Sequence, residues 1–149
     1  MAEVIKVEVL GNTVEVEKGI TFLTLAKQFA KEYSDDIALA RFNGKLVELC
    51  KSIEADGELE FLTTATSMGR RTYRRSVTML MQKALHNVNP ELHVEVRHSI
   101  SQGFYCTIRE DIKVTQELLE QLKSEMKKIV ELDLPIEKES MGTSEAVKL

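Results

Sequence analysis

Apolar and polar residues alternate at the start of this chain, and this spacing limits what the segment can fold into. The alternation runs through residues 4–9 and 13–17 and is interrupted at Gly11-Asn12. A period of two is that of a strand with one buried face, and a glycine-asparagine pair suits a tight turn between two such strands. The sequence therefore predicts a β-hairpin over residues 4–17.

The apolar spacing then changes to that of a helix. Thr21 is a good N-cap residue, and apolar residues recur after it at helical intervals, at Phe22, Leu25, Ala26, Phe29, Ala30 and Tyr33. Three strand-like segments follow, separated by the turn-forming dipeptides Asn43-Gly44 and Asp56-Gly57: residues 37–42, 45–49 and 58–62. This order predicts one small mixed sheet packed on one helix within residues 1–65.

Residues 66–149 repeat this mixture of patterns. A helix is predicted from Met68 to Asn87, ending before Pro90, and two strands are predicted around the turn Gln102-Gly103. Thr115 then caps a further helix with an apolar face. The last residues, 143–149, have the pattern of a helix that has only begun, and so few residues do not hold an isolated helix. We therefore expect this second domain to be truncated at its C-terminal end.

Charge is unevenly distributed along the chain, whose formal net charge is -4. Residues 1–65 carry seven basic and twelve acidic residues, residues 66–109 carry seven and two, and residues 110–149 carry six and ten. The basic middle is dominated by Arg70, Arg71, Arg74 and Arg75. Near a helix N-terminus, both mutual repulsion and the helix dipole disfavour such a cluster. We expect an anionic partner for it: RNA or nucleotide phosphate, or carboxylates of residues 1–65 or of a missing region.

Several classes of protein are disfavoured by the composition. No apolar run reaches the roughly 20 residues of a membrane helix, and the N-terminus lacks the apolar region of a signal peptide. Cys50 and Cys106 are too few for a disulfide framework, and we expect both to be small buried hydrophobes in a reducing cytoplasm. The sequence predicts a cytoplasmic protein with no membrane partner.

The remaining polar and aromatic candidates are few. His93 and His98 are five residues apart on one strand, so they point to opposite faces and do not share a metal; no metal site is predicted. We expect His98 opposite Thr107, partly buried on the apolar face of the strand. Phe104 and Tyr105 are candidates for stacking on a base, with packing in the hairpin core as the alternative.

The arrangement of residues 1–63 resembles a TGS domain, the β-grasp (ubiquitin-like) module found in threonyl-tRNA synthetases, certain GTPases and (p)ppGpp synthetases. The resemblance is carried by three segments in this order: Lys18-Gly19-Ile20-Thr21, Phe42-Asn43-Gly44-Lys45 and Ile53-Glu54-Ala55-Asp56-Gly57. It implies an α+β protein whose first domain, residues 1–65, is a β-grasp.

Residues 70–149 resemble the second N-terminal domain of threonyl-tRNA synthetase, which edits mischarged tRNA. The matching segments are Pro90, Ile100-Ser101-Gln102-Gly103-Phe104-Tyr105, Leu134-Pro135-Ile136 and Glu145-Ala146-Val147. The resemblance implies that residues 66–149 form a small α+β domain of this type. The synthetase carries a His-x-x-x-His pair on the first helix of this domain, and those positions are Arg75 and Met79 here. Arginine is neither a base nor a metal ligand at neutral pH, so no catalytic residue is predicted.

Bacterial uridine-kinase-like nucleoside kinases combine both modules, and Thr72-Tyr73-Arg74-Arg75-Ser76 is similar to their version of the helix. This resemblance implies a non-catalytic regulatory or ligand-binding region in front of an ATP-dependent kinase domain of the same polypeptide. The chain has no Gly-x-x-x-x-Gly-Lys-Ser/Thr loop, so ATP and Mg²⁺ are expected only for that missing domain and no cofactor for this chain. The alternative is an RNA-binding module of a threonyl-tRNA synthetase-like protein. The oligomeric state is left open.

Overall fold

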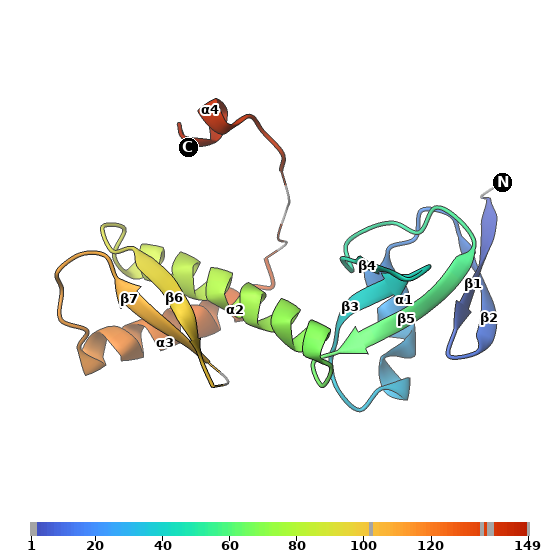
Figure 1. Cartoon of the computed structure of the whole chain (residues 1–149), viewed down its shortest axis with the longest axis horizontal. Helices are drawn as coiled ribbons and strands as arrows, with labels where there is room; N and C mark the ends of the chain where they lie inside the picture. The colour runs from blue at the N-terminus through green and yellow to red at the C-terminus, as the bar shows by residue number, and fades with distance from the viewer. Residues whose placement is uncertain (1–2, 102, 135, 137–138, 149) are drawn as a thin grey trace. The chain divides into compact units, whose positions relative to one another are not determined.

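The computed structural model describes residues 3–101, 103–134, 136 and 139–148. The chain forms two compact units, one ending at Thr78 and the other beginning at Met79. Each unit contains both strands and helices, so the predicted α+β class is confirmed (Figure 1). The division falls within helix α2 (Ser67–Val88), and the boundary expected from sequence, at residues 65–66, lies just before that helix.

The first unit is built on a five-stranded mixed sheet with the strand order β2-β1-β5-β3-β4. Strands β1 and β5 pair in parallel and the other neighbours are antiparallel. This is the β-grasp arrangement that the sequence predicts, in the predicted order of elements. The elements are β1 (Val4–Val9), β2 (Asn12–Glu17), α1 (Phe22–Phe29), a 3-10 turn η1 (Ala30–Glu32), β3 (Ile37–Phe42), β4 (Lys45–Val47) and β5 (Gly57–Thr63).

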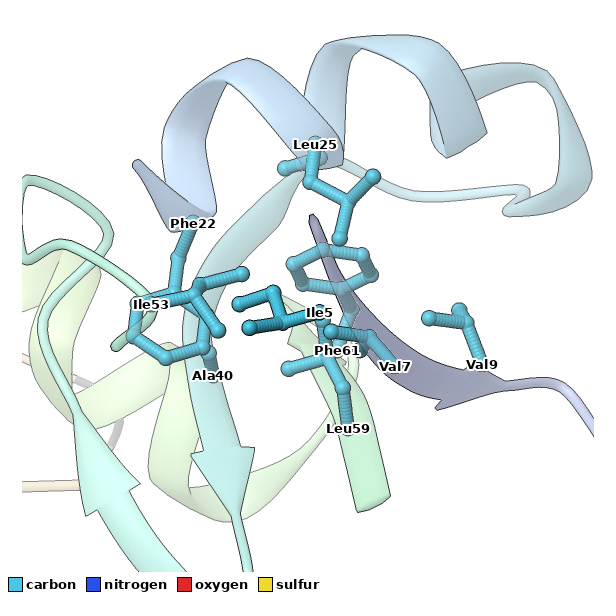
Figure 2. Packing of buried hydrophobic residues seen from close by; sticks show 10 residues of the cluster. Ile5, Val7, Val9, Phe22, Leu25, Ala40, Ile53, Leu59 and Phe61 are labelled. Atoms are coloured by element: carbon cyan, nitrogen blue, oxygen red, sulfur yellow. The ribbon is translucent and has the colours of Figure 1, made fainter. Parts of the chain in front are cut away.

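Helix α1 packs on one face of this sheet and closes the core (Figure 2). Thr21 begins the helix, because its hydroxyl accepts a hydrogen bond from the Thr24 backbone N–H at 3.1 Å. Phe22 and Leu25 are buried against the inward residues of the strands, including Val7. The alternating pattern of β1 thus places every second side chain in one core, as its period requires.

A loop residue, Ile53, completes that core. Its side chain is fully buried, although it lies between strands β4 and β5. The loop is held by backbone hydrogen bonds of 2.8 Å from Gly19 N–H to the Ile53 carbonyl and from Ile53 N–H to the Ile20 carbonyl. The loop therefore joins the start of α1 to the core through both its backbone and its side chain.

A tight junction connects β5 to α2. The Thr66 hydroxyl donates a hydrogen bond to the Thr63 carbonyl at 2.8 Å and accepts one from the Gly69 N–H at 3.1 Å, so Thr66 acts as the N-cap of α2. A Cβ at Gly69 would lie 2.1 Å from the Thr63 carbonyl oxygen. Only glycine fits this approach without a shift of the backbone, and the junction thereby fixes the first turn of α2 against the first unit.

The second unit consists of the end of α2, the antiparallel pair β6 (Val94–Ile100) and β7 (Gly103–Ile108), α3 (Gln116–Glu131) and a short α4 (Thr143–Ala146). Ile100 pairs with Gly103, so the turn between the strands lies one residue earlier than expected; Gln102 lies outside the described residues. Residues of α2, the β6–β7 ribbon and α3 surround an apolar cavity of about 390 Å³. The two helices thus lie on the same side of the ribbon.

The two cysteines differ from expectation. Cys50 is exposed rather than buried, because it lies in the loop after β4 and not within a strand. Cys106 is half-buried and lines the cavity of the second unit, and both thiols are free. The prediction of a buried residue was therefore wrong for Cys50.

Candidate nucleic-acid interface

The four arginines predicted as a cluster lie on the first turns of α2, within the first unit. Arg70, Arg71 and Arg75 are exposed and Arg74 is partly buried. At 100° per residue, the four positions cover an arc of roughly 140° around the helix axis. The cap at Thr66 and the close approach at Gly69 position this arc relative to the sheet.

These guanidinium groups have few partners within the chain. Arg70 Nη2 donates a hydrogen bond to the Ala65 carbonyl at 2.8 Å. The guanidinium groups of Arg71, Arg74 and Arg75 form no hydrogen bond or ion pair with the residues that the structure describes. Four like charges within two helical turns repel each other without compensation. The described carboxylates therefore do not supply the anionic partner that the sequence predicts.

An exposed aromatic ring lies beside the arginine cluster. This residue is Tyr73 of α2, and 55% of it is exposed. The reason is that this stretch of α2 precedes the segment that packs in the second unit, where Ala84 and Leu85 are buried.

A second polar surface lies on the β6–β7 ribbon, whose Tyr105 and Thr107 also line the cavity. Its register shifts between Val96 and His98, so that Val96 pairs with Cys106 and His98 with Tyr105. Arg97 is the extra residue of this β-bulge. The expectation that His98 lies opposite Thr107 on the apolar face was wrong: the earlier turn places it opposite Tyr105, and the bulge moves the residues of β6 that follow it to the other side.

His98 and Tyr105 instead form a ring pair at the end of the ribbon. Their ring centroids are 5.1 Å apart with an interplanar angle of 33°, and 47% of Tyr105 is exposed. Phe104, the other predicted stacking residue, is the strand neighbour of Tyr105 and therefore points to the opposite face. The structure thus brings Tyr105 together with His98 and not with Phe104.

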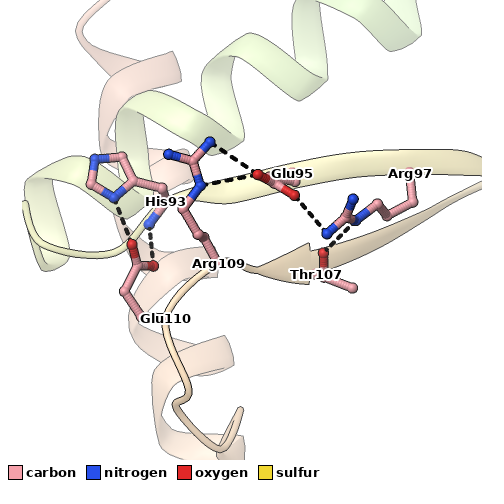
Figure 3. Close-up of polar contacts among 6 residues, drawn as sticks. All are labelled: His93, Glu95, Arg97, Thr107, Arg109 and Glu110. Carbon is pink, nitrogen blue, oxygen red and sulfur yellow. Dashed lines mark hydrogen bonds and ion pairs between the residues drawn. The ribbon is translucent and has the colours of Figure 1, made fainter.

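Two arginines flank one carboxylate on the same face (Figure 3). Glu95 contacts Arg97 Nη2 at 2.8 Å through Oε2, and Arg109 Nη2 at 3.0 Å through Oε1. Arg97 Nε also donates a hydrogen bond to the Thr107 hydroxyl at 3.1 Å. Sequence reasoning missed this network, because it depends on the cross-strand register, which places Glu95 opposite Thr107.

His93 and Glu110 form a further pair at the other end of the ribbon (Figure 3). Glu110 accepts hydrogen bonds of 2.8 Å from the His93 backbone N–H and, at its other oxygen, from the His93 ring Nδ1. These contacts lower the pKa of Glu110 to about 2. The hydrogen bond from the His93 backbone has the larger effect, and the hydrogen bond from the His93 ring has the next largest. This carboxylate is therefore ionised at neutral pH, and each of its oxygens accepts a hydrogen bond.

Neither a cluster of metal-ligating side chains nor a membrane-spanning helix is found among the described residues. No three His, Cys, Asp or Glu side chains among those residues gather closely enough to hold a metal ion. No described helix is long and apolar enough to cross a membrane. Arg75 and Met79 lie one turn apart on α2, at the positions of the histidine pair in the resembled editing domain.

The chain is similar in sequence to bacterial threonine-tRNA ligases, while no family model matches it. It is 33% identical over 139 residues to the ligase of Clostridium tetani and 32% identical over 138 residues to that of Caldanaerobacter subterraneus subsp. tengcongensis. The ligase of Streptococcus equi subsp. zooepidemicus is 31% identical over 140 residues. Each match covers 93% of this chain but 21% or 22% of the ligase.

The chain resembles one part of a threonine-tRNA ligase. It spans about a fifth of the length of the ligases it matches, so the activity of a whole ligase does not follow from the similarity. The matches support the expected TGS-type, synthetase-like module over the whole chain. They give no support to the uridine-kinase parent that the Arg-Arg-Ser segment suggested, and they favour the alternative.

Proposed function

We propose that this chain is a non-catalytic RNA-binding module of a threonyl-tRNA synthetase-like protein. The observation that carries the proposal is the arginine cluster of α2, whose guanidinium groups lack acidic partners among the described residues. Guanidinium groups bind phosphate oxygens bidentately, and phosphate contacts supply most sequence-independent affinity for nucleic acid. The ligases that the chain resembles are named for action on tRNA, which agrees with such a ligand.

Arg70, Arg71, Arg74 and Arg75 would each contact phosphate in this role. Residues one turn apart, such as Arg71 and Arg75, lie about 6 Å apart along the helix. They can therefore contact the same phosphate or neighbouring phosphates. Binding of phosphate would also relieve the repulsion that these residues impose on the first turns of the helix.

A salt titration of RNA binding tests the proposal. We expect the 149-residue chain to bind fluorescein-labelled tRNA in an anisotropy assay, with an affinity that falls steeply as salt increases. The double variant Arg71→Ala/Arg75→Ala should bind more weakly. Its slope of log affinity against log salt should be smaller by about 1.5, because two phosphate contacts are lost.

The double variant Lys123→Ala/Lys127→Ala is a matched control. It also removes two positive charges one turn apart from an exposed helix face, but on α3. The proposal predicts that this control retains the salt slope of the unaltered chain. An equal loss of affinity in both double variants, or absence of any salt-dependent tRNA binding, would contradict it.

Absence of catalysis is the second part of the proposal. Arg75 and Met79 replace the histidine pair of the resembled editing domain, and neither side chain serves as a general base at neutral pH. We expect release of amino acid from mischarged threonine tRNA to stay at the uncatalysed rate when the chain is added. Hydrolysis above that rate would contradict this part without affecting RNA binding.

The second candidate function is the regulatory region of a uridine-kinase-like nucleoside kinase, with the kinase domain of the same polypeptide as partner. The departure at Thr72-Tyr73-Arg74-Arg75-Ser76 from the synthetase pattern is what favours it. ATP and Mg²⁺ would then belong to that kinase domain and not to this chain. In this case the arginine cluster would bind protein carboxylates, and tRNA affinity would not depend on Arg71 and Arg75.

We place either function in the cytoplasm. Cys50 and Cys106 are both free thiols, and Cys50 is exposed, which suits a reducing compartment. Location of the labelled parent protein by cell fractionation tests this part.

A further inference from the structure

We propose that the β6–β7 ribbon carries a second RNA site, in which an unpaired base stacks on the His98–Tyr105 ring pair and the neighbouring phosphate binds Arg97. This inference rests on the proposed RNA-binding function and adds a site on the other unit with a narrower ligand class, single-stranded RNA. We call this surface the ribbon face. It consists of His93, Glu95, Arg97, His98, Tyr105, Thr107 and Arg109.

The β-bulge creates the ribbon face at its outer end. In a regular strand Arg97 and His98 would point to opposite sides, but the register shift leaves Arg97 unpaired. The Arg97 guanidinium contacts Glu95 and Thr107, while the next ring, His98, pairs with Tyr105. A cation and an aromatic pair thereby lie on one face within two consecutive residues.

The guanidinium group of Arg97 is oriented by two partners and keeps further N–H donors for a ligand. It donates a hydrogen bond through Nε to Thr107, and its Nη2 forms an ion pair with Glu95. A guanidinium carries five N–H donors, so the rest of the fork has no acceptor among the described residues. Orientation by two partners reduces the side-chain entropy that a phosphate contact would cost.

The carboxylates on and beside the ribbon face, Glu95 and Glu110, already have partners within the chain. Glu95 is shared between Arg97 and Arg109. Both oxygens of Glu110 accept hydrogen bonds from His93. A phosphate that approaches Arg97 therefore meets carboxylates whose charge is offset by cations or N–H donors, so that the repulsion is small.

The ring pair favours a base rather than a folded duplex. His98 and Tyr105 form a tilted ring contact, with an interplanar angle of 33° and a centroid distance of 5.1 Å. Tyr105 lines the cavity, yet 47% of it is exposed, and this exposed part can contact a base. Bases inside a duplex are already stacked on each other, whereas single-stranded bases are free to stack on aromatic side chains.

Binding of a fluorescein-labelled hexanucleotide of adenylate tests the site, with the whole chain and anisotropy as the readout. We expect Tyr105→Leu to weaken binding about 5- to 150-fold, the range that loss of one stacked base gives. Tyr105→Phe keeps the ring and should bind like the unaltered chain. An abasic hexanucleotide of equal length should bind the unaltered chain and Tyr105→Leu equally.

Tyr73→Leu is the matched control, since it removes the other exposed tyrosine, beside the arginine cluster. Its affinity for the hexanucleotide should not change. The inference is overturned if Tyr105→Leu and Tyr105→Phe bind equally, or if Tyr73→Leu alone weakens binding. That failure is distinct from failure of the proposed function, which is decided by tRNA binding to the Arg71→Ala/Arg75→Ala variant.

Discussion

Replacement of Gly69 by alanine should destabilise the first unit, although alanine is the better helix former. Helix propensity alone predicts a gain of about 1 kcal/mol for Gly→Ala inside a helix. Against it, the added Cβ would lie 2.1 Å from the Thr63 carbonyl oxygen and 2.7 Å from the Thr63 carbonyl carbon. Forced repacking of this kind costs about 1–3 kcal/mol. The cost should lie near the upper end, because the obstacle is the backbone of β5, which is paired with β1 and β3.

We therefore expect Gly69→Ala to lower the free energy of unfolding of the first unit by about 1–2 kcal/mol, the difference between these two effects. Hydrogen exchange of the buried amides of β1 and β5 measures this unit separately from the other one. Gly142→Ala is the control, since a Cβ there meets nothing within 4 Å and φ is -66°. Increased protection of the β1 and β5 amides in Gly69→Ala would refute the argument, because propensity would then outweigh the contact with Thr63.

Two further predictions concern the core and the ribbon. Ile53→Ala should lower the free energy of unfolding of the first unit by about 2–5 kcal/mol, the range for truncation of a fully buried isoleucine, and a urea titration followed by circular dichroism checks it. The pKa of Glu110 is lowered from 4.5 to about 2, so its hydrogen bonds with His93 stabilise the second unit above pH 4.5 and this contribution is lost as the pH falls towards 2. NMR titration of the Glu110 carboxyl carbon should show this low midpoint, and Glu110→Gln should remove that part of the acid sensitivity; a midpoint near 4.5 would contradict the contacts with His93.

Short sequence patterns predicted most of the fold, because the strands, the first helix and its turns form where their own residues favour them. The alternation in residues 4–9 and 13–17 became the β1–β2 hairpin, and Thr21 caps α1 as expected. The turn Asn43-Gly44 formed with both residues at positive φ, which asparagine and glycine tolerate better than other residues. Each of these features depends on neighbours within a few residues, so it can be read from a short window of sequence.

The candidate site was less predictable, since it depends on register and on distant partners. The helical positions of the arginines followed from their spacing, but whether carboxylates pair with them did not. The bulge at Arg97 has no marker in the sequence, and it reverses the sides on which His98 and Ile100 lie. The ring pair with Tyr105 depends on that shift and on the position of the turn, which lies one residue earlier than expected. A fixed alternation could not predict this pair.

The parallel pairing of β1 with β5 also has a consequence for synthesis of the protein. These strands are the first and the last of the first unit, and they are neighbours at the centre of its sheet. A growing chain therefore exposes the open side of the β1–β2 hairpin until residues 57–63 have left the ribosome. The unit cannot complete its folding gradually from the N-terminus and must close nearly in one step.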